Sequence, residues 1–381
     1  MRTKICIIST VGSPLIVFMR PHIEMLSEYY DVTLIANTTQ IEVSDLLGPN
    51  VRLIPLKIER KTSLFYDLIA LISLYFIFRN EKFLSIHSLM PKAGLLAMVA
   101  GYLACIPCRI HTFTGQVWSN KSGFKRWGLR FWDKIIAWCS TCLLADSFSQ
   151  KIFLIEESVV RSNKIDVLAN GSICGVDLLR FKPNSLSKFD IRSQLAIPSD
   201  SLVYLFLGRL NKDKGILDLA VAFSRVAAKI PNIYLLIVGP DEEGLTLDLN
   251  KTLRCCHDRY RQVGFTSHPE RYMAASDVFL LPSYREGFGS VVIEAAASHL
   301  PAIVSNIYGL VDAVENGKTG MLHPPGDINT IEKYMIEIFQ NKSLRNEMAR
   351  LACERAHEKF SKTIVVAEML KFYTRNLNFN G

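Results

Sequence analysis

Two stretches in the second half of the chain place charged side chains where a strand leads through a loop into a helix. The first, Leu205-Phe-Leu-Gly-Arg-Leu-Asn-Lys-Asp-Lys-Gly-Ile, ends a strand-like run at Gly208, and Arg209 and Lys214 follow it. In parallel α/β sheets, ligands bind outside the carboxyl ends of strands. Two cations at that position could converge on an anion. A solvated basic loop is the alternative for this stretch taken alone.

In the second stretch, a strand expected at Val278–Leu281 enters the loop Glu286-Gly-Phe-Gly, and a helix is expected from about Ser290. The two glycines of this loop would let the backbone approach a ligand closely. The N–H groups at the start of the helix would suit a phosphate. Glu286 lies in the loop and Glu294 about one turn into the helix, where both carboxylates could accept hydrogen bonds from sugar hydroxyls. For Glu294 the alternative is an acid that complements the helix dipole.

The elements that must position these residues alternate along the whole chain as short apolar runs and helix-length segments. Near-continuous apolar strands between helices predict parallel sheets covered on both faces. The polar segment 182–200 is the expected linker between two doubly wound α/β domains, residues 1–185 and 186–360, and we expect the helix at 361–381 to pack back on the first. The expected strands are 4–9, 32–36, 51–56, 84–87, 109–113, 143–145, 165–168, 202–207, 234–238, 278–281 and 302–304.

The composition excludes a disordered or fibrous chain, because 49% of the 381 residues are hydrophobic and 21% are charged. The net charge of +8 is uneven: residues 1–190 hold 22 basic and 15 acidic side chains, and the rest hold 22 and 21. This asymmetry predicts an anionic partner for the first half. The N-terminus lacks a signal-peptide pattern, and the apolar stretches 64–78 and 93–106 fall short of the ~20 residues of a membrane span. We therefore expect a cytoplasmic protein.

All four tryptophans lie in the basic segment 118–138, WSNKSGFKRWGLRFWDKIIAW. If residues 123–137 form a helix, one face carries Phe124, Trp127, Phe131 and Ile135, flanked by Lys125, Arg126, Arg130 and Lys134. Aromatic residues beside cations suit the headgroup region of anionic lipids. The alternative is a helix that faces the core and has a solvated basic edge.

We expect no metal site. The Cys105-x2-Cys108 and Cys139-x2-Cys142 pairs are separated by more residues than in most zinc sites and lie in apolar sequence, so buried thiols are the preferred interpretation. The sequence also contains no Asp-x-Asp, a motif that can hold a divalent metal ion.

Taken together, the Glu286-x7-Glu294 pair and the Gly-Arg-x4-Lys-Gly stretch resemble those of retaining glycosyltransferases of the GT-B fold, family four. Asn170-Gly-Ser-Ile-Cys-Gly-Val-Asp177, Val238-Gly-Pro and Gly317-x2-Gly320 extend the resemblance over most of the chain. It implies two Rossmann-like domains with the active site in the cleft between them. It also implies a UDP-sugar donor held mainly by the second domain, and front-face attack in which a donor phosphate oxygen takes the acceptor proton.

Carried over position by position, the resemblance implies that Arg209 and Lys214 bind the donor diphosphate, Glu286 the transferred sugar and Glu294 the ribose. Gly264 and Phe265 match a segment that contacts the base, and His111 matches a residue that touches the donor sugar. The implied catalytic residues are His111, Arg209, Lys214 and Glu286. The implied donor-binding residues are Gly12, Gly208, Arg209, Lys214, Gly264, Phe265, Glu286, Gly287, Phe288, Gly289, Ser290, Val291 and Glu294.

The stretch from His111 to Gly123, with Ser88-Leu-Met-Pro-Lys-Ala-Gly94, is similar to a subset that adds an N-acetylhexosamine, often N-acetylgalactosamine in α1,3 linkage, to a sugar on undecaprenyl pyrophosphate in O-antigen assembly. The expected partners are therefore a UDP-sugar, this lipid-linked acceptor and an anionic membrane surface at the inner face of the cytoplasmic membrane, with no cofactor and no nucleic acid. The expected acceptor-binding residues are Lys92, Lys121, Lys125 and Arg126. Two alternatives stay open: a nucleotide-sugar 2-epimerase and, more remotely, a nucleic-acid-binding protein.

Overall fold

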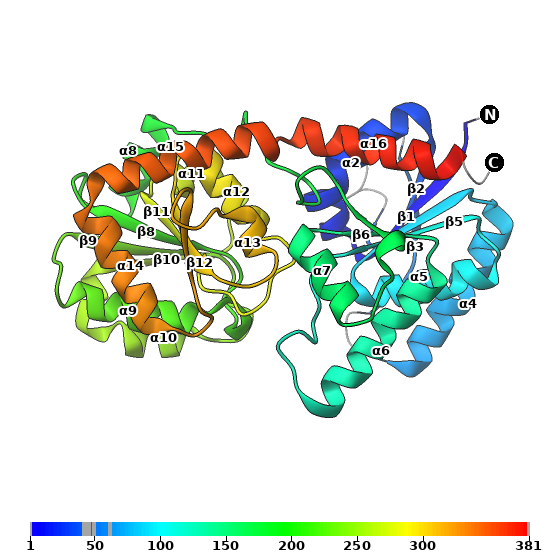
Figure 1. Cartoon of the computed structure of the whole chain (residues 1–381), viewed down its shortest axis with the longest axis horizontal. Helices are drawn as coiled ribbons and strands as arrows, with labels where there is room; N and C mark the ends of the chain where they lie inside the picture. Colours follow the sequence, from blue (N-terminus) through cyan, green and yellow to red (C-terminus); the bar gives the residue numbers. More distant parts are fainter. Residues whose placement is uncertain (1, 40–46, 48–50, 60–62, 379–381) are drawn as a thin grey trace. The chain divides into compact units, whose positions relative to one another are not determined.

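The computed structural model describes residues 2–39, 47, 51–59 and 63–378 (Figure 1). The chain divides into two compact units. Unit 1 comprises Met1–Cys174 together with Lys362–Gly381, and unit 2 comprises Gly175–Ser361. The division therefore lies between Cys174 and Gly175, and the C-terminal helix α16 (Lys362–Asn378) belongs to unit 1.

In the described part of unit 1, seven strands form a parallel sheet in the order β3-β2-β1-β4-β5-β6-β7. Successive residues of β1 alternate between two cores, because Ile5 and Ile7 join one cluster and Cys6 and Ile8 the other. Burial on both faces explains the near-continuous apolar sequence of these strands. The strands are β1 (Lys4–Val11), β2 (Asp31–Asn37), β3 (Arg52–Pro55), β4 (Ser85–Leu89), β5 (Cys108–Phe113), β6 (Cys142–Ala145) and β7 (Ile165–Val167).

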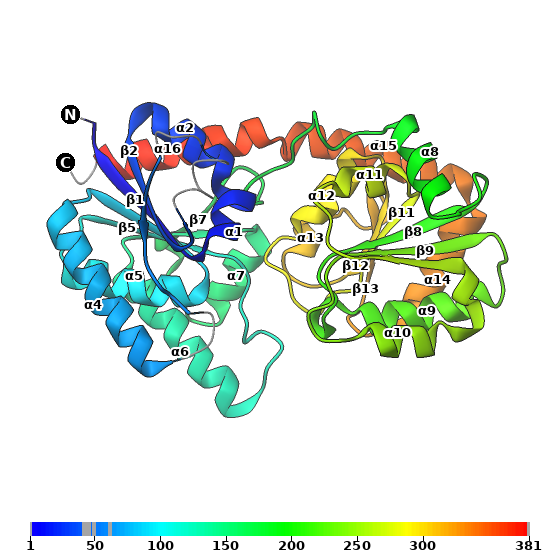
Figure 2. The same cartoon turned by 180° about the vertical axis from the view of Figure 1, so that it is seen from behind.

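Helices cover both faces of this sheet. One face carries α4 (Leu64–Glu81), α5 (Pro91–Leu103), α6 (Gly123–Cys139) and α7 (Phe148–Glu156), and Figure 2 shows α4, α5 and α6 on the same side of the unit. The other face carries η1 (Leu15–Met19), α2 (Arg20–Tyr29) and α16. Two short turns, α1 (Gly12–Pro14) and η2 (Ser162–Lys164), complete the described elements of this unit.

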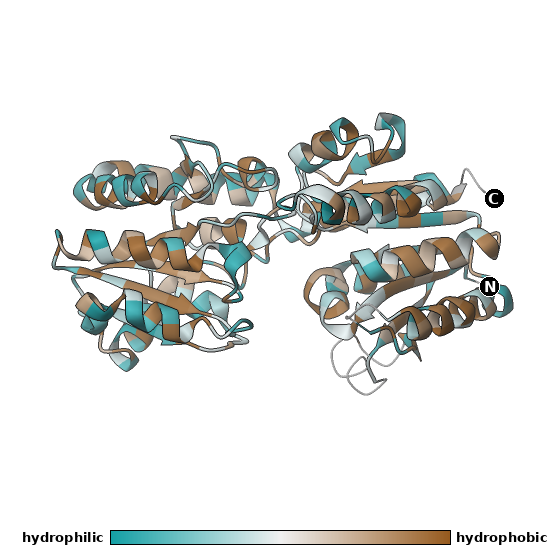
Figure 3. Cartoon of the chain, turned by 90° about the horizontal axis from the view of Figure 1, so that it is seen from below, coloured by the Kyte–Doolittle hydropathy of each residue, from teal (hydrophilic) through white to brown (hydrophobic). Residues whose placement is uncertain are grey.

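Unit 2 repeats this architecture with six parallel strands in its described residues, ordered β10-β9-β8-β11-β12-β13. Figure 3 shows the strands of both sheets mostly in brown, the colour of hydrophobic residues. The strands are β8 (Leu202–Leu207), β9 (Ile233–Val238), β10 (Tyr260–Val263), β11 (Val278–Leu281), β12 (Ala302–Ser305) and β13 (Gly320–His323). The helices are α8 (Ser185–Gln194), η3 (Lys212–Lys214), α9 (Ile216–Ala227), α10 (Thr246–Thr252), η4 (Arg254–Arg259), α11 (Pro269–Ala274), α12 (Ser290–Ala297), α13 (Leu310–Ala313), α14 (Ile328–Gln340) and α15 (Lys342–Lys359).

The predicted fold class of two parallel α/β units is confirmed, but the segment 182–200 is not the expected linker. Most of it forms α8, whose N-cap Asn184 accepts a hydrogen bond from the backbone N–H of Ser187. Arg192 of this helix is only 4% exposed. The polar composition reflects a surface helix of which only Ile191 and Arg192 are buried.

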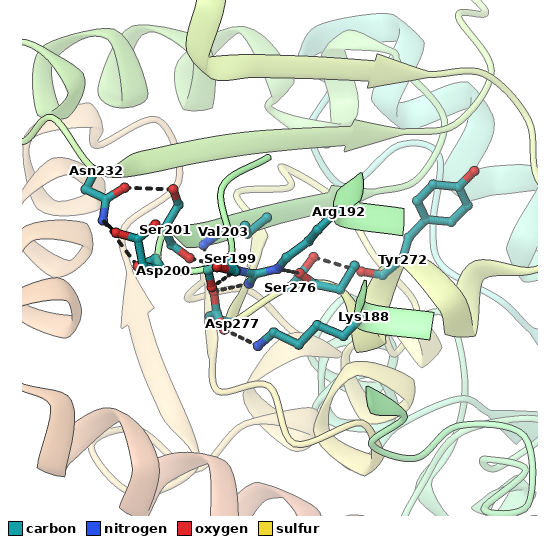
Figure 4. A network of polar contacts seen from close by, with 11 residues as sticks. Lys188, Arg192, Ser199, Asp200, Ser201, Val203, Asn232, Tyr272, Ser276 and Asp277 are labelled. Carbon is teal, nitrogen blue, oxygen red and sulfur yellow. Dashed lines mark hydrogen bonds and ion pairs between the residues drawn. The ribbon is translucent and has the colours of Figure 1, made fainter. Parts of the chain in front are cut away.

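Arg192 anchors α8 to the amino ends of the unit 2 strands (Figure 4). Its guanidinium donates to the carbonyl oxygens of Ala275, Ser199 and Ser201 and, over 2.7 Å, to Oδ2 of Asp277. The same Oδ2 accepts the backbone N–H of Val203 at the start of β8. This ion pair, in which the arginine is buried and the aspartate partly buried, therefore ties α8 to two neighbouring strands.

The helix expected at 123–137 is α6, and it does not bury the aromatic face. Phe124 is 83% exposed and Trp127 62% exposed, and the two rings lie 5.7 Å apart. The interior side of α6 is formed by Asp133, Ile136 and Ala137. The alternative of a core-facing aromatic stripe is therefore wrong for this helix. Within the described residues, no helix has the length and apolar character needed to cross a membrane.

Candidate active site

The candidate site in unit 2 lies where the strand order of the sheet reverses. From β8 the chain proceeds through β9 and β10 in one direction, and from β11 through β12 and β13 in the other. Since β8 and β11 are neighbours, the loops that follow them leave the same sheet edge. Such a switch point is the usual ligand position in an open α/β sheet.

Lys214 and Glu286, which lie 72 residues apart, meet at this switch point. Nζ of Lys214 lies 2.5 Å from Oε1 of Glu286, and the side chains are 18% and 11% exposed. The hydroxyl of Ser283 donates to the same Oε1 over 2.8 Å. Glu286 lies in a loop, as predicted, but its side chain is largely buried and has two partners. Ser283 was not among the predicted site residues, although it stands three residues before Glu286 in the sequence.

Backbone contacts hold the two loops together. Gly215, at φ 67°, follows Lys214, and a Cβ on it would lie 2.0 Å from the carbonyl oxygen of Pro282. Asn211 caps the turn η3 by accepting the backbone N–H of Lys214. The Lys214 loop therefore packs directly on the loop that carries Glu286, which positions both side chains before any ligand binds.

Arg209 lies at the same edge but is held less tightly. Its Nη1 is 2.9 Å from Oε2 of Glu242, and the two side chains are 52% and 37% exposed. Exposed ion pairs contribute about 0–1 kcal/mol. A bound diphosphate could therefore take the place of Glu242 at small cost.

Glu294 lies on the half-buried side of α12, and burial raises its pKa to about 7. Arg180 opposes that rise and Glu270 adds to it. Arg180 is itself held by Glu270, at 2.9 Å, and by the carbonyl oxygen of Ser267, at 2.6 Å. The carboxyl of Glu294 is therefore poised between its charged and neutral forms near neutral pH.

The other donor residues inferred for unit 2 lie along the same sheet edge. Gly208 follows β8, and Gly264 and Phe265 follow β10, where the Phe265 side chain is 80% exposed. Phe288 does not reach solvent: it is 2% exposed, and its ring lies 5.3 Å from that of Phe360. Gly287 and Phe288 lie in the loop before α12, Gly289 is its N-cap, and Ser290 and Val291 are its first two residues.

In unit 1, His111 is a buried residue of β5. Its Nδ1 is 2.8 Å from the hydroxyl of Ser88, and a Cβ on Gly94 of α5 would lie 2.4 Å from its ring. Burial lowers the pKa of His111 to about 3, so the ring is neutral at pH 7. Gly12 follows β1, and a Cβ there would lie 2.8 Å from the hydroxyl oxygen of Thr38.

A buried polar group that sequence reasoning missed follows β5 and β6. Gln150 donates to the side-chain oxygen of Gln116 and accepts the backbone N–H of Asp146. Burial raises the pKa of Asp146 to about 7, and its Oδ1 has no hydrogen-bond partner within the described ranges. In the sequence, the polar residues Asp146 and Ser147 directly after an apolar strand could have indicated this buried polar cluster.

The four cations expected to bind an acceptor differ in their surroundings. Lys121 and Lys125 are exposed. Lys92 is paired with Asp67, with Nζ and Oδ1 2.6 Å apart, and Arg126 is paired with Glu157. An acceptor phosphate would have to compete with a carboxylate at the latter two positions.

Neither cysteine pair forms part of a metal cluster within the described residues, where no three His, Cys, Asp or Glu side chains are gathered as a metal ion would require. Cys108 and Cys139 are buried, as preferred from the sequence, but Cys105 is exposed. All nine cysteines are free thiols.

Comparisons with known proteins identify a family for each half of the chain. Residues 187–355 match the family described as glycosyl transferases group 1, and residues 24–171 match the glycosyl transferase 4-like domain. The capsular polysaccharide biosynthesis glycosyltransferase CapM of Staphylococcus aureus is 32% identical over 357 residues, which is 93% of each chain. The UDP-Gal:alpha-D-GlcNAc-diphosphoundecaprenol alpha-1,3-galactosyltransferase of Escherichia coli is 32% identical over 325 residues, or 84% of this chain and 82% of that protein.

Solved structures share the fold at low sequence identity. The crystal structure of Anabaena Alr3699/HepE in complex with UDP superposes with a TM-score of 0.81 at 16% identity, covering 98% of this chain and all of that one. A sucrose-phosphate synthase from Thermosynechococcus elongatus gives a TM-score of 0.82 at 22% identity, covering 98% and 99% of the two chains.

Proposed function

This chain belongs to the group 1 glycosyltransferases of the GT-B fold, and on that premise we propose that it transfers an N-acetylhexosamine from a UDP-sugar to a sugar on undecaprenyl pyrophosphate. The pairing of Lys214 with Glu286 at the switch point of unit 2 is the main support for the proposal. The ammonium group of Lys214 suits binding of a diphosphate, and the carboxylate of Glu286 suits hydrogen bonds donated by sugar hydroxyls. N-acetylgalactosamine in α1,3 linkage is the first choice. Galactose is the second, since UDP-Gal is named for the Escherichia coli relative.

The proposed mechanism follows from where charge develops. Cleavage between the sugar and the diphosphate places negative charge on the leaving UDP and oxocarbenium character on the sugar. Arg209, Lys214 and the N-terminus of α12 would stabilise the leaving group, and preorganised charges of this kind are strong contributors to catalysis. Glu286 would hold hydroxyls of the transferred sugar, and Glu294 the ribose. We propose retention of configuration, with a donor phosphate oxygen taking the proton of the acceptor hydroxyl.

The acceptor is proposed to bind unit 1, where the basic excess of the chain is concentrated. Lys121 and Lys125 are exposed and could meet the acceptor pyrophosphate directly, whereas Lys92 and Arg126 would first exchange a carboxylate partner. We propose that the enzyme works as a peripheral protein at the inner face of the cytoplasmic membrane, without a metal ion or other cofactor and without a nucleic-acid partner.

The proposal predicts the outcome of a substrate panel. The full chain should be incubated with UDP- and GDP-sugars and with N-acetylglucosaminyl-diphosphoundecaprenol, with and without excess EDTA, and the products analysed by mass spectrometry. We expect one added N-acetylhexosamine, with a yield that EDTA leaves unchanged. A product formed without acceptor, as an epimerised or free sugar, would contradict transfer. Preference for GDP-mannose would contradict the donor assignment alone, and dependence on a metal would contradict the metal-free mechanism.

Removing either donor cation should slow transfer. Arg209→Ala and Lys214→Ala should each raise the barrier by about 2–4 kcal/mol, or roughly 30- to 1,000-fold in turnover, because each removes a preorganised charge from the leaving group. The matched control is Arg225→Ala, since Arg225 forms a half-exposed ion pair with Glu332 elsewhere in unit 2. Steady-state kinetics measure the effect. Equal activity in Arg209→Ala and Arg225→Ala would show that Arg209 is not part of the site.

A further inference from the structure

The outer face of α4 is apolar, although it faces solvent. Phe65 is 69% exposed, Ile69 46%, Ile72 48% and Phe76 58%, and their spacing places them along one stripe of the helix. The opposite stripe of α4, with Leu74 at its centre, is buried against the rest of unit 1. A helix that is hydrophobic all round is normally buried in a core or a membrane. The outer stripe of α4 therefore lacks a partner of matching chemistry within the described structure.

Charge is sparse on this helix. Asp67 and Arg79 enclose a run of apolar and small residues with no charged side chain between them. Asp67 does not add a free negative charge, because its carboxylate lies 2.6 Å from Nζ of Lys92 on α5. The middle of α4 thus presents no charged side chain.

Neighbouring helices extend the apolar area. α4 packs on α5 and α5 packs on α6, as Figures 1 and 2 show. The end of α5 exposes Tyr102 and Leu103, and the ring of Tyr102 lies 4.8 Å from that of Trp138 on α6. We name the following set the α4–α6 surface: Leu64, Phe65, Leu68, Ile69, Ile72, Phe76, Tyr102, Leu103, Phe124, Trp127, Phe131 and Trp138.

The charge around this surface indicates which kind of partner it binds. Residues 64–139 contain nine basic and three acidic side chains, and a further acid, Glu157, pairs with Arg126 and Arg130 of α6. The three acids are all engaged: Asp67 with Lys92, Glu81 with Arg52, and Asp133 with the indole N–H of Trp118. A second copy of this chain would bring like charges together across the interface. An anionic phospholipid surface supplies both hydrocarbon and negative charge.

We propose that the α4–α6 surface docks on an anionic phospholipid bilayer, with α4 lying in the plane of the membrane and its outer stripe inserted at the boundary between headgroups and acyl chains. The inference deepens the proposed function, on which it rests for the membrane-linked acceptor. It assigns the hydrophobic part of binding to α4, which the sequence analysis dismissed as too short to span, and the salt-sensitive part to the cations of α6.

The test compares three forms of the full chain in flotation with vesicles of phosphatidylglycerol and phosphatidylethanolamine. One carries Ile69→Gln, Ile72→Gln and Phe76→Gln, which keep helix propensity and remove the apolar stripe. The matched control carries Leu186→Gln, Phe189→Gln and Leu247→Gln, which are exposed apolar residues of unit 2. At high salt, where α6 electrostatics are screened, we expect the α4 variant to lose at least tenfold in vesicle partitioning while the control binds like the wild type.

Two outcomes would overturn the proposal. One is unchanged vesicle partitioning of the α4 variant with an unaltered circular-dichroism spectrum. The other is a wild-type dimer in sedimentation that becomes a monomer in the α4 variant, which would make this surface an interface between copies. If the triple variant does not fold, the single variant Phe76→Gln is used, with a proportionally smaller loss expected.

An activity arm separates this proposal from the proposed function. The α4 variant should keep its rate on a water-soluble sugar-diphosphate acceptor with a short lipid and lose rate on the same acceptor embedded in vesicles. Equal loss on both acceptors would contradict a membrane role for α4. Wild-type protein that binds vesicles but transfers no sugar would contradict the proposed function, but it would still support docking of the α4–α6 surface on lipid.

Discussion

Replacing Glu286 with alanine should lower turnover by about a thousandfold or more, the upper end of what loss of one preorganised polar group costs an active site. The carboxylate is the proposed contact for the transferred sugar, and it also holds Nζ of Lys214 at 2.5 Å. Without it, Lys214 loses its position as well as its partner. Single-turnover measurement with saturating donor would place the loss in the chemical step.

Two further variants make this result interpretable. Because Glu286 is largely buried, its alanine variant leaves Lys214 unpaired and will lose some stability, so rates must be measured well below the unfolding temperature. Glu286→Gln keeps the shape and should retain more stability but still lose most activity. Glu354→Ala, which removes an exposed partner of Arg350, should behave like the wild type. Near-normal turnover of Glu286→Ala would remove the switch point of unit 2 from consideration as the active site.

Replacing Asp277 with alanine should lower the free energy of unfolding by about 3–5 kcal/mol, as breaking a buried ion pair does. The change leaves the buried guanidinium of Arg192 without its carboxylate and removes the acceptor of the Val203 N–H at the start of β8. Urea unfolding followed by circular dichroism measures the effect.

The control for this prediction lies on α8, the helix that carries Arg192. Asp190 of α8 is 52% exposed and lies 3.6 Å from Arg271, so Asp190→Ala should cost less than about 1 kcal/mol. An Asp277→Ala variant no less stable than Asp190→Ala would show that the network in Figure 4 does not hold α8 to the sheet.

The sequence alone was sufficient for the class of fold and for the family. Buried parallel strands are continuous in apolar residues, so β8 and β11 were predicted with their observed bounds. The charged residues that follow those strands were recognisable as a family pattern. That recognition is confirmed by the matches over both halves of the chain.

Strands at the edges of the sheets were harder to predict from the sequence. β10 and β13 are short strands at the two edges of the unit 2 sheet, and the sequence analysis missed both. All four residues of β10 are only half-buried, so its sequence, Tyr-Arg-Gln-Val, lacks an apolar run. Helix α8 was mistaken for a linker for a similar reason: it buries only Ile191 and Arg192, so its sequence shows no extended apolar face.

Only the tertiary structure decided which helix faces and loops contact each other and which remain exposed to solvent. Nothing in the spacing of Lys214 and Glu286 along the chain indicates that their side chains touch, since that contact depends on β8 and β11 being neighbours. The stripe of α4 that contains Phe76 is as apolar as the stripe that packs inward, so the sequence could not tell which one is buried. Local sequence encodes the period and polarity of each element, whereas contact and exposure are properties of pairs of elements that only folding brings together.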